Sequence, residues 1–394
     1  MKARTVLMNS VYDEHEIELY IEKDMFTRHS MVDLSYAKML STLKTYLPNI
    51  RSLCVTSSVR GLFDKNVHLI GEYLPYLRNL YLHASNLNDE GLSRLFSKCP
   101  NLQHLSLIHA HITGDCFSQV PPLKSLNITN TGEMFQSIDG FDRLSDSLIS
   151  FQADFHRNNA VKSRRLFKSF KKIKKFSWSV NSQNDLVEVL NSVSMYGKLE
   201  ELVLRVNREI ESPDLQWMQD FASIKSLSLF FRYAVSVDKL LHILNPCSNV
   251  SSLSLQLFHL IERGENTEQD ESKLLLRVVN AIKQMQSLTV IDFEMRREEP
   301  YVIKLNDCFK WMLESERFRE ISFGFLSDEE VNSIIEYLQT AQRESNARFY
   351  VEIQVQTDSV IRIPLDIPMN IRSRRRRYRD TQPQFLVYIK RLNN

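Results

Sequence analysis

The sequence predicts an α/β solenoid in which about twelve strand-and-helix units stack side by side. The first observation is a six-residue motif with apolar residues at positions 1, 4 and 6, as in Leu77-x-x-Leu80-x-Leu82 and Leu102-x-x-Leu105-x-Leu107. The second is its spacing, because successive copies of this strand motif are 21 to 38 residues apart. A period of this size is typical of repeat architectures, in which one unit cannot bury its apolar face alone.

The strand motif recurs along most of the chain. Alternating apolar and polar residues at its end predict a half-buried strand. Helices between the motifs take more width than strands, so the strands should line a concave face and the helices a convex one. The leucine-rich copies begin at Ile50, Leu77, Leu102, Leu123, Leu148, Ile173, Leu199, Ile224, Val250, Leu288, Phe318 and Tyr350.

The segments between the motifs predict the helices. In the first full unit, Asn88 or Asp89 can cap a helix, and Leu92, Leu95 and Phe96 share one face. Residues 114–120 are too short for more than a turn or a 3₁₀ helix. The other predicted helices span residues 35–47, 62–74, 90–99, 160–170, 184–196, 213–221, 236–244, 273–285 and 327–342, the last with a capping box at 327–330.

The repeats divide the chain into three parts. Residues 29–355 form the predicted solenoid, with a weak first strand at 31–34. Residues 1–28 are unplaced, although 16–21 alternate like a strand. Residues 356–394 form a C-terminal cap and basic tail, in which 361–364 and 385–389 are candidate edge strands.

Composition narrows the class of protein. The chain has 50 basic and 48 acidic residues and a net charge of +2, which does not suggest a polyelectrolyte. Its five cysteines are odd in number and scattered, so we expect reduced thiols rather than a disulfide framework. Neither a signal peptide nor a run of 18 apolar residues is present, so we expect a cytoplasmic or nuclear protein without a membrane span.

Three short segments carry a family resemblance. Cys99-Pro-Asn-Leu and Cys247-Ser-Asn-Val place a cysteine three residues before the strand motif, and Asn88-Asp-Glu-Gly-Leu92 is similar to a known helix start. Together they resemble the cysteine-containing leucine-rich repeat of F-box/LRR proteins, the substrate receptors of Skp-cullin-F-box ubiquitin ligases. No F-box is recognised, and residues 31–47 resemble the segment directly after that module in the family. The resemblance therefore implies a Skp-type adaptor and a cullin only if an F-box lies upstream.

Candidate binding residues lie at the polar positions of the motif. Positions 3, 5 and 7 should point into the concave face, where small serines in the middle leave room for a bulky partner. Aromatic and arginine residues there and in the following loops are the types most often found at interface hot spots. For Phe231 in one such loop, packing on the next repeat is an equal alternative. The candidates are Tyr81, His83, His104, Gln152, Asp154, Arg157, Arg205, Arg208, Phe230, Arg232 and Tyr233.

No pattern in the sequence predicts catalysis, a cofactor or a metal. Cys99, His104, His109, His111 and Cys116 lie close together but match no zinc motif. Phosphate-binding loops, nucleophile elbows and HExxH helices are all missing from the sequence.

Two basic runs remain. The run at 162–175 has eight Lys and Arg residues and is most simply a helix with a basic solvent face. The run of Arg374, Arg375, Arg376 and Arg377 is a candidate nuclear-import signal or nucleic-acid contact, with a solvated terminal loop as the alternative. Because the whole chain is nearly neutral, nucleic acid is the less expected partner.

These observations predict protein binding by a leucine-rich concave face. The first hypothesis is the substrate-recognition part of an F-box/LRR ubiquitin ligase, and the alternative is an interaction scaffold with no link to a ligase. In either case we expect a monomer that works within a hetero-complex.

Overall fold

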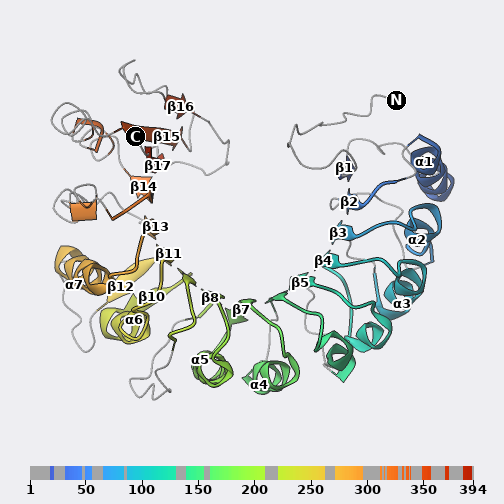
Figure 1. The fold of residues 1–394 in the computed structure, drawn as a ribbon, viewed down its shortest axis with the longest axis horizontal. Helices are drawn as coiled ribbons and strands as arrows, with labels where there is room; N and C mark the ends of the chain where they lie inside the picture. The colour runs from blue at the N-terminus through green and yellow to red at the C-terminus, as the bar shows by residue number, and fades with distance from the viewer. Residues whose placement is uncertain are drawn as a thin grey trace. The chain divides into compact units, whose positions relative to one another are not determined.

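The strand motifs form short parallel strands in the computed structural model, and the segments after them form helices (Figure 1). The chain divides into two units, unit 1 at Met1–Asn181 and unit 2 at Ser182–Asn394, and each is considered by itself. The structure describes residues 18–21, 32–46, 49–55, 65–83, 87–129, 139–154, 160–208, 221–261, 271–295, 311–312, 315, 317–326, 331, 334–336, 338, 348–355, 369–371 and 385–392.

Unit 1 contains a sheet in which neighbouring strands are parallel and follow the order of the chain. Position 4 of each motif lies beside position 4 of the next, as in Leu53, Leu80 and Leu105. These leucines are at most 2% exposed, because positions 4 and 6 face the core. The strands are β1 Glu18–Ile21, β2 Ser52–Val55, β3 Asn79–His83, β4 His104–Ile108, β5 Ser125–Thr129, β6 Ser150–Ala153 and β7 Lys175–Val180.

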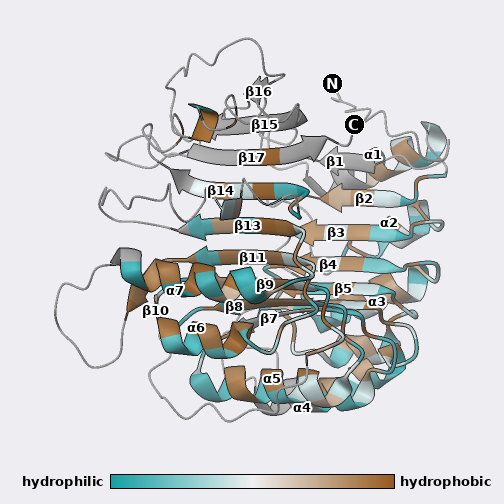
Figure 2. Ribbon diagram, turned by 60° about the vertical axis from the view of Figure 1, so that its left-hand side comes forward, coloured by the Kyte–Doolittle hydropathy of each residue, from teal (hydrophilic) through white to brown (hydrophobic). Residues whose placement is uncertain are grey.

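Helices cover the outer side of the unit 1 strands (Figure 1). Their apolar and polar residues lie on different faces, visible as brown and teal segments in Figure 2. The segment predicted as a turn or 3₁₀ helix is the 3₁₀ helix η2, as expected. The outer elements are α1 Val32–Tyr46, α2 Leu69–Tyr73, α3 Asp89–Lys98, η2 Asp115–Gln119, η4 Asp139–Leu144 and α4 Ala160–Ser169.

Hydrogen bonds repeated from one strand motif to the next hold this register. From the motif at Ile50 to the one at Leu148, the carbonyl at position 2 accepts two backbone N–H groups of the next motif, so Arg51 O accepts from Arg78 and Asn79, both at 2.8 Å. The asparagine of the Cys-x-Asn segment adds a side-chain bond. Asn101 Nδ2 donates to Pro75 O and Asn249 Nδ2 donates to Ala222 O, each at 3.1 Å.

Asp89 links two neighbouring repeats, a role that the sequence did not predict. Asn88 caps helix α3, with its side chain accepting from Gly91 N at 3.1 Å. The Asp89 carboxylate instead accepts the N–H groups of Thr113 at 2.6 Å, Gly114 at 3.1 Å and Cys116 at 3.0 Å, at the start of η2. Burial alone would raise the pKa of Asp89, but the hydrogen bonds from Thr113 and Cys116 outweigh it and the pKa is lowered.

Unit 2 repeats the same design. Strands β8, β9, β11, β13 and β14 are parallel neighbours in that order, and a second small sheet pairs β10 with β12. Helices lie on the outer side of the strands in Figure 1. The elements are β8 Glu201–Val206, β9 Ser226–Phe231, β10 Ala234–Ser236, β11 Ser252–Leu257, β12 His259–Ile261, β13 Val290–Met295, β14 Glu320–Leu326, α5 Gln183–Tyr196, α6 Val237–Leu244 and α7 Glu271–Gln284.

The C-terminal strands depart from the repeat. Strand β17, Phe385–Leu392, lies antiparallel between β14 and β15, Arg348–Val355. The segment predicted as a candidate edge strand is thus an interior strand, and the motif at Tyr350 does not stack directly on the preceding one. Strand β16, Met369–Ile371, pairs with β15 at the end of the strand order.

The predicted first strand at 31–34 is also wrong, because residues 32–34 belong to helix α1. The strand that precedes this helix is β1, which lies N-terminal to residue 29 and pairs in parallel with β2. The predicted elements at 361–364 and 327–330, and most of the helix at 213–221, lie outside the described residues. The domain boundaries and the number of repeats stay predictions.

The core of unit 1 is rich in aromatic contacts. Phe141 stacks on Phe117 at 4.8 Å between ring centroids and meets Phe151 edge-on at 5.6 Å. Phe176 stacks on Trp178 at 5.3 Å, and all five rings are at most 1% exposed. Each unit of the chain is therefore a leucine-rich-repeat solenoid, with its strands on one side and its helices on the other.

Candidate functional site

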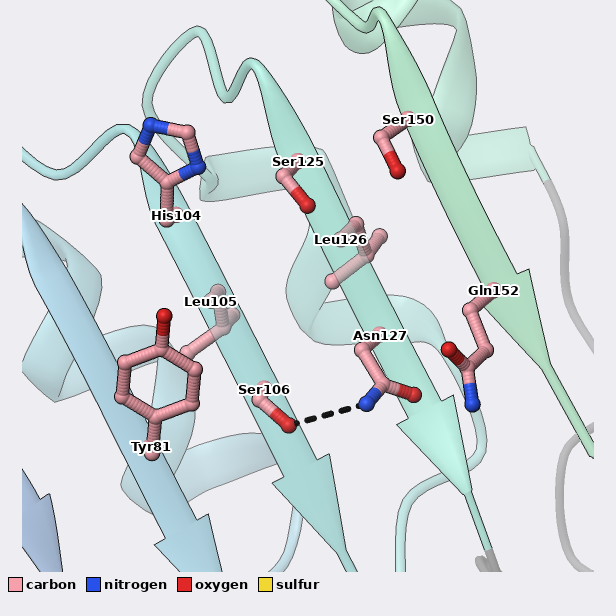
Figure 3. A pocket seen from close by; sticks show the side chains of 9 residues that line it. All are labelled: Tyr81, His104, Leu105, Ser106, Ser125, Leu126, Asn127, Ser150 and Gln152. Carbon is pink, nitrogen blue, oxygen red and sulfur yellow. Dashed lines mark hydrogen bonds between the residues drawn. The ribbon is translucent and has the colours of Figure 1, made fainter. Parts of the chain in front are cut away.

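A shallow polar pocket lies on the strand side of unit 1 (Figure 3). Its volume is about 180 Å³, and side chains from four neighbouring strands line it. Position 3 supplies one row across β4 to β6, and position 5 supplies a second row across β3 to β6. The lining residues are Tyr81, His104, Leu105, Ser106, Ser125, Leu126, Asn127, Ser150 and Gln152.

The parallel register places these side chains together. His104, Ser125 and Ser150 are neighbours in the first row, because they are the first residues of their strands. Successive side chains of a strand point to opposite faces, so Leu105 and Leu126 point into the core between the two rows. The two rows are therefore two residues apart along each strand, and the buried residue at position 4 lies between them.

Asn127 offers an unsatisfied hydrogen-bond acceptor in this pocket. Its Nδ2 donates to Ser106 Oγ at 3.1 Å, the dashed line in Figure 3. Its Oδ1 is buried and has no hydrogen-bond partner within the described part of the chain. An N–H or O–H group of a partner, or a water, would remove the cost of this unpaired acceptor.

The lining contains no Lys, Arg, Asp or Glu. Hydroxyl, amide and imidazole groups therefore provide its hydrogen bonds, and Tyr81, which is 44% exposed, adds an aromatic wall. This combination suits an uncharged polar side chain of a partner better than a phosphate or a cation.

Two other candidates of unit 1 lie beyond the pocket. His83, at the end of β3, stacks on His109 with ring centroids 4.7 Å apart. Burial, and then the neighbouring His109, lower the pKa of His83, so this ring is neutral at pH 7. His109 itself has a φ of 61°, a left-handed conformation that is uncommon for residues other than glycine. Asp154 follows β6 and is half-buried.

The candidates of unit 2 form a separate group. Arg205 of β8 and Phe230 of β9 are register neighbours, and the guanidinium lies 5.6 Å from the ring centroid. Arg232 and Tyr233 are exposed in the bend after β9, and Arg208 is exposed after β8. Phe231 is only 4% exposed, so it packs in the core, in agreement with the alternative interpretation.

The remaining candidates cannot be placed. Arg157 and the run of Arg374, Arg375, Arg376 and Arg377 lie outside the described residues. Conversely, the candidates chosen from the sequence did not include Asn127. The structure draws attention to it because its Oδ1 has no hydrogen-bond donor among the described residues. Its position 5 in the motif was the signal that could have identified it.

The three buried cysteines, Cys99, Cys116 and Cys247, are structural. Burial raises the pKa of Cys99 and of Cys247 to about 12, so both are neutral thiols in the core. Burial also raises the pKa of Cys116. Among the side chains that the structure describes, no three His, Cys, Asp or Glu residues lie close enough together to hold a metal ion.

Ion pairs with acidic residues partly neutralise the positive charge of the basic run at 162–175. Arg165 pairs with Asp139 at 2.6 Å and Lys171 pairs with Asp146 at 3.0 Å. Phe167 and Phe170 are buried. The prediction of one helix for the whole run is only partly confirmed, because α4 ends at Ser169 and residues 170–174 lead into β7. None of the described helices has both the length and the apolarity needed to cross a membrane.

Comparisons with known proteins identify two similar proteins of Arabidopsis thaliana. The chain is 30% identical over 92 residues to putative F-box/LRR-repeat protein 23, a match that covers 20% of the chain and 20% of that protein. It is 29% identical over 118 residues to F-box protein SKIP19, which covers 27% of the chain and 39% of that protein. The chain thus spans only 20% and 39% of the lengths of these relatives. No family model matches it. The chain resembles F-box/LRR proteins, in agreement with the motifs at Cys99 and Cys247.

Proposed function

We propose that the chain binds a protein partner on the strand side of unit 1, as the substrate-recognition part of an F-box/LRR-type ubiquitin ligase. The observation that carries the binding proposal is the pocket between Tyr81 and Gln152 with its unsatisfied acceptor on Asn127. The observations that support the ligase link are the cysteine-containing repeats and the similarity to two F-box proteins.

The pocket has the features of a specificity subsite. A buried acceptor without a partner favours a ligand that supplies a donor, because leaving it unpaired costs about 1–3 kcal/mol. Tyr81 provides a rigid ring whose burial contributes contact area at little cost in conformational entropy. A side-chain amide or hydroxyl of the partner would fill the volume and pair with Asn127, so we infer that a polar, uncharged residue anchors the partner here.

The binding proposal is tested with the double variant Tyr81→Ala and Gln152→Ala. Truncation of two anchor residues should weaken the affinity of the full chain for its purified partner about tenfold or more, because each interface anchor contributes at least about 1 kcal/mol. The matched variant is Tyr233→Ala with Gln256→Ala, which removes the same residue types from unit 2. Affinities are measured by calorimetric titration. A larger loss of affinity in the unit 2 variant than in the unit 1 variant would contradict the proposed pocket.

The ligase link is tested by co-purification with a Skp-type adaptor. Both the present chain and any longer product with additional N-terminal sequence should be tested. Adaptor binding by the longer product alone would make this chain the receptor portion. Binding by neither would favour the alternative, a leucine-rich-repeat scaffold that has no link to a ligase.

A further inference from the structure

A row of cations follows the edge of unit 1 at which strands β2 to β7 begin. Position 2 of the strand motif, one residue before each strand, is occupied by Arg51, Arg78, Lys124 and Lys174 in four of the six motifs. Arg78, Lys124 and Lys174 are exposed, and Arg51 is half-buried. We call these four residues the basic row.

The repeat fixes the spacing of the basic row. The carbonyl of Arg78 accepts the N–H groups of Gln103 and His104, and the carbonyl of Gln103 accepts those of Lys124 and Ser125 at 2.7 and 3.1 Å. Every position 2 is therefore held one strand from the next. Since neighbouring strands lie about 4.8 Å apart, Arg78 and Lys124 are roughly 10 Å apart along the edge, and so are Lys124 and Lys174.

This edge carries a strong local charge. The five residues that lead into each strand, from two before position 1 to position 3, contain seven Lys and Arg residues and one acid in unit 1, a net charge of +6. The same five positions of unit 2 contain four basic and four acidic residues and are neutral. These segments are 48–52, 75–79, 100–104, 121–125, 146–150 and 171–175 in unit 1, and 197–201, 222–226, 248–252, 286–290 and 316–320 in unit 2.

Neighbouring acids do not neutralise three members of the basic row, Arg51, Arg78 and Lys124. Asp146, the single acid in these segments of unit 1, pairs with Lys171 at 3.0 Å, and Glu72 lies 3.9 Å from Lys98. Within the described ranges, the side chains of Arg51, Arg78 and Lys124 have no ion-pair partner. A positive edge of this kind attracts an anionic partner, and salt screens that attraction.

The edge also includes an exposed aliphatic side chain. Ile149 occupies position 2 between Lys124 and Lys174, and it is 38% exposed. Single-stranded nucleic acids bind through aromatic stacking platforms along a basic groove, and position 2 of unit 1 holds no aromatic residue. Alternating cations and an isoleucine instead suit a peptide with acidic and apolar residues.

We propose that the basic row binds an extended acidic segment of the protein partner, with carboxylates at about every third residue. In the polyproline II conformation, with three residues per turn and a rise of about 3.1 Å per residue, residues three apart share one face and are separated by roughly 9 Å, close to the spacing of Arg78, Lys124 and Lys174. This inference rests on the proposed function, because the row borders the His104 and Ser125 side of the pocket and would extend the same contact.

The test is fluorescence anisotropy of a labelled peptide with the full chain. The probe has glutamate at every third position and valine and threonine between them, and the control probe has glutamine in place of glutamate. Arg78→Glu with Lys124→Glu should weaken binding of the glutamate probe at least about tenfold, and Arg78→Gln with Lys124→Gln should have an intermediate effect. The matched variant, Lys198→Glu with Arg319→Glu, makes the same charge change at exposed residues of unit 2 and should have an effect of less than about twofold.

Several outcomes would overturn the inference. They are equal binding of the two probes, equal loss in the two charge-reversed variants, or tighter binding of a single-stranded RNA oligonucleotide than of the glutamate probe. Circular dichroism of the variants checks that each is folded. If the glutamate probe fails while the Tyr81→Ala and Gln152→Ala variant still loses the partner, the basic row is rejected and the proposed pocket stands.

Discussion

Units 1 and 2 have the same repeat but present different chemistry. In both, position-2 carbonyls join successive motifs and the leucines of positions 4 and 6 are buried. Among the described residues, unit 1 has a cluster of stacked aromatic rings and the polar pocket, and its strand-entry edge has a net charge of +6, whereas the equivalent edge of unit 2 is neutral. The comparison teaches that burial dictates positions 1, 4 and 6, while positions 2, 3 and 5 are free to carry function.

Truncation of core side chains should give the largest effects on stability, and the aromatic core of unit 1 the largest of these. Phe141→Ala removes a ring that contacts Phe117, Phe151 and Phe170, and should lower the free energy of unfolding by about 3–5 kcal/mol. Leu255→Ala in unit 2 should cost about 2–5 kcal/mol. Urea unfolding followed by tryptophan fluorescence measures both, and Phe141→Leu serves as the conservative control. A loss below about 1 kcal/mol for Phe141→Ala would contradict this aromatic packing.

Asp89 should give the next largest effect, because its carboxylate joins two repeats of unit 1. Asp89→Ala should cost about 1–3 kcal/mol, whereas Ser182→Ala, which removes a simple helix cap in unit 2, should cost about 1 kcal/mol. Chemical denaturation at pH 7 measures both losses. A smaller cost for Asp89→Ala than for Ser182→Ala would remove this distinction between the units.

The contribution of Asp89 should also depend on pH. Its pKa in the folded protein is lowered from 3.8, because hydrogen bonds outweigh burial, so its stabilisation is complete above that value and is lost as the pH falls through the folded pKa. The difference in stability between the natural protein and Asp89→Asn should therefore shrink as the pH falls from about 4 through the folded pKa. A difference that stays constant over this range would contradict the assignment.

The asparagine bonds should show what the units share. Asn101→Ala in unit 1 and Asn249→Ala in unit 2 each remove one side-chain bond of 3.1 Å to the preceding repeat. Each change should lower the free energy of unfolding by about 0.5–1.5 kcal/mol, and the two losses should be similar. Clearly unequal losses in thermal unfolding would mean that the two units do not use this bond alike.

The smallest effect should be the coupling of Arg205 and Phe230 in unit 2. A double-mutant cycle with Arg205→Gln and Phe230→Leu isolates their cation–π contact from the other contacts of each residue. We expect a coupling energy of about 0.5–1 kcal/mol from urea unfolding. A coupling energy of zero would show that the contact between Arg205 and Phe230 does not stabilise unit 2.

The sequence predicts most of this fold because each apolar position repeats. Leu80 and Leu105 are buried neighbours, and the 3₁₀ helix at Asp115–Gln119 follows from a segment too short for an α-helix. Helices α3, α5 and α6 begin and end within one or two residues of the predicted bounds. Local periodicity is sufficient here, since each repeat contacts mainly its neighbours.

The ends of the chain were harder to predict because their pairing is not local. Strand β17 lies between β14 and β15 and is antiparallel to both, which no period in the sequence indicates. Strand β1 has no leucine-rich motif, and its place beside β2 depends on tertiary pairing.

The binding surface was only partly predicted. The sequence singled out Tyr81, His104 and Gln152, and the structure places all three around one pocket. Asn127 was missed, because the unpaired state of its Oδ1 depends on three-dimensional surroundings. The basic row was missed as well, since its members are about 25 to 50 residues apart in sequence and only the register brings them into line.

The most direct test of the binding proposal is site-specific photocrosslinking to the purified partner. A benzophenone amino acid is placed at Tyr81, on the strand side of unit 1, at Tyr46, which is 77% exposed on helix α1, and at Ser228, at the same motif position in unit 2. Our account predicts a crosslink from position 81 and none from positions 46 or 228. A crosslink from position 46 or 228 with none from position 81 would contradict it.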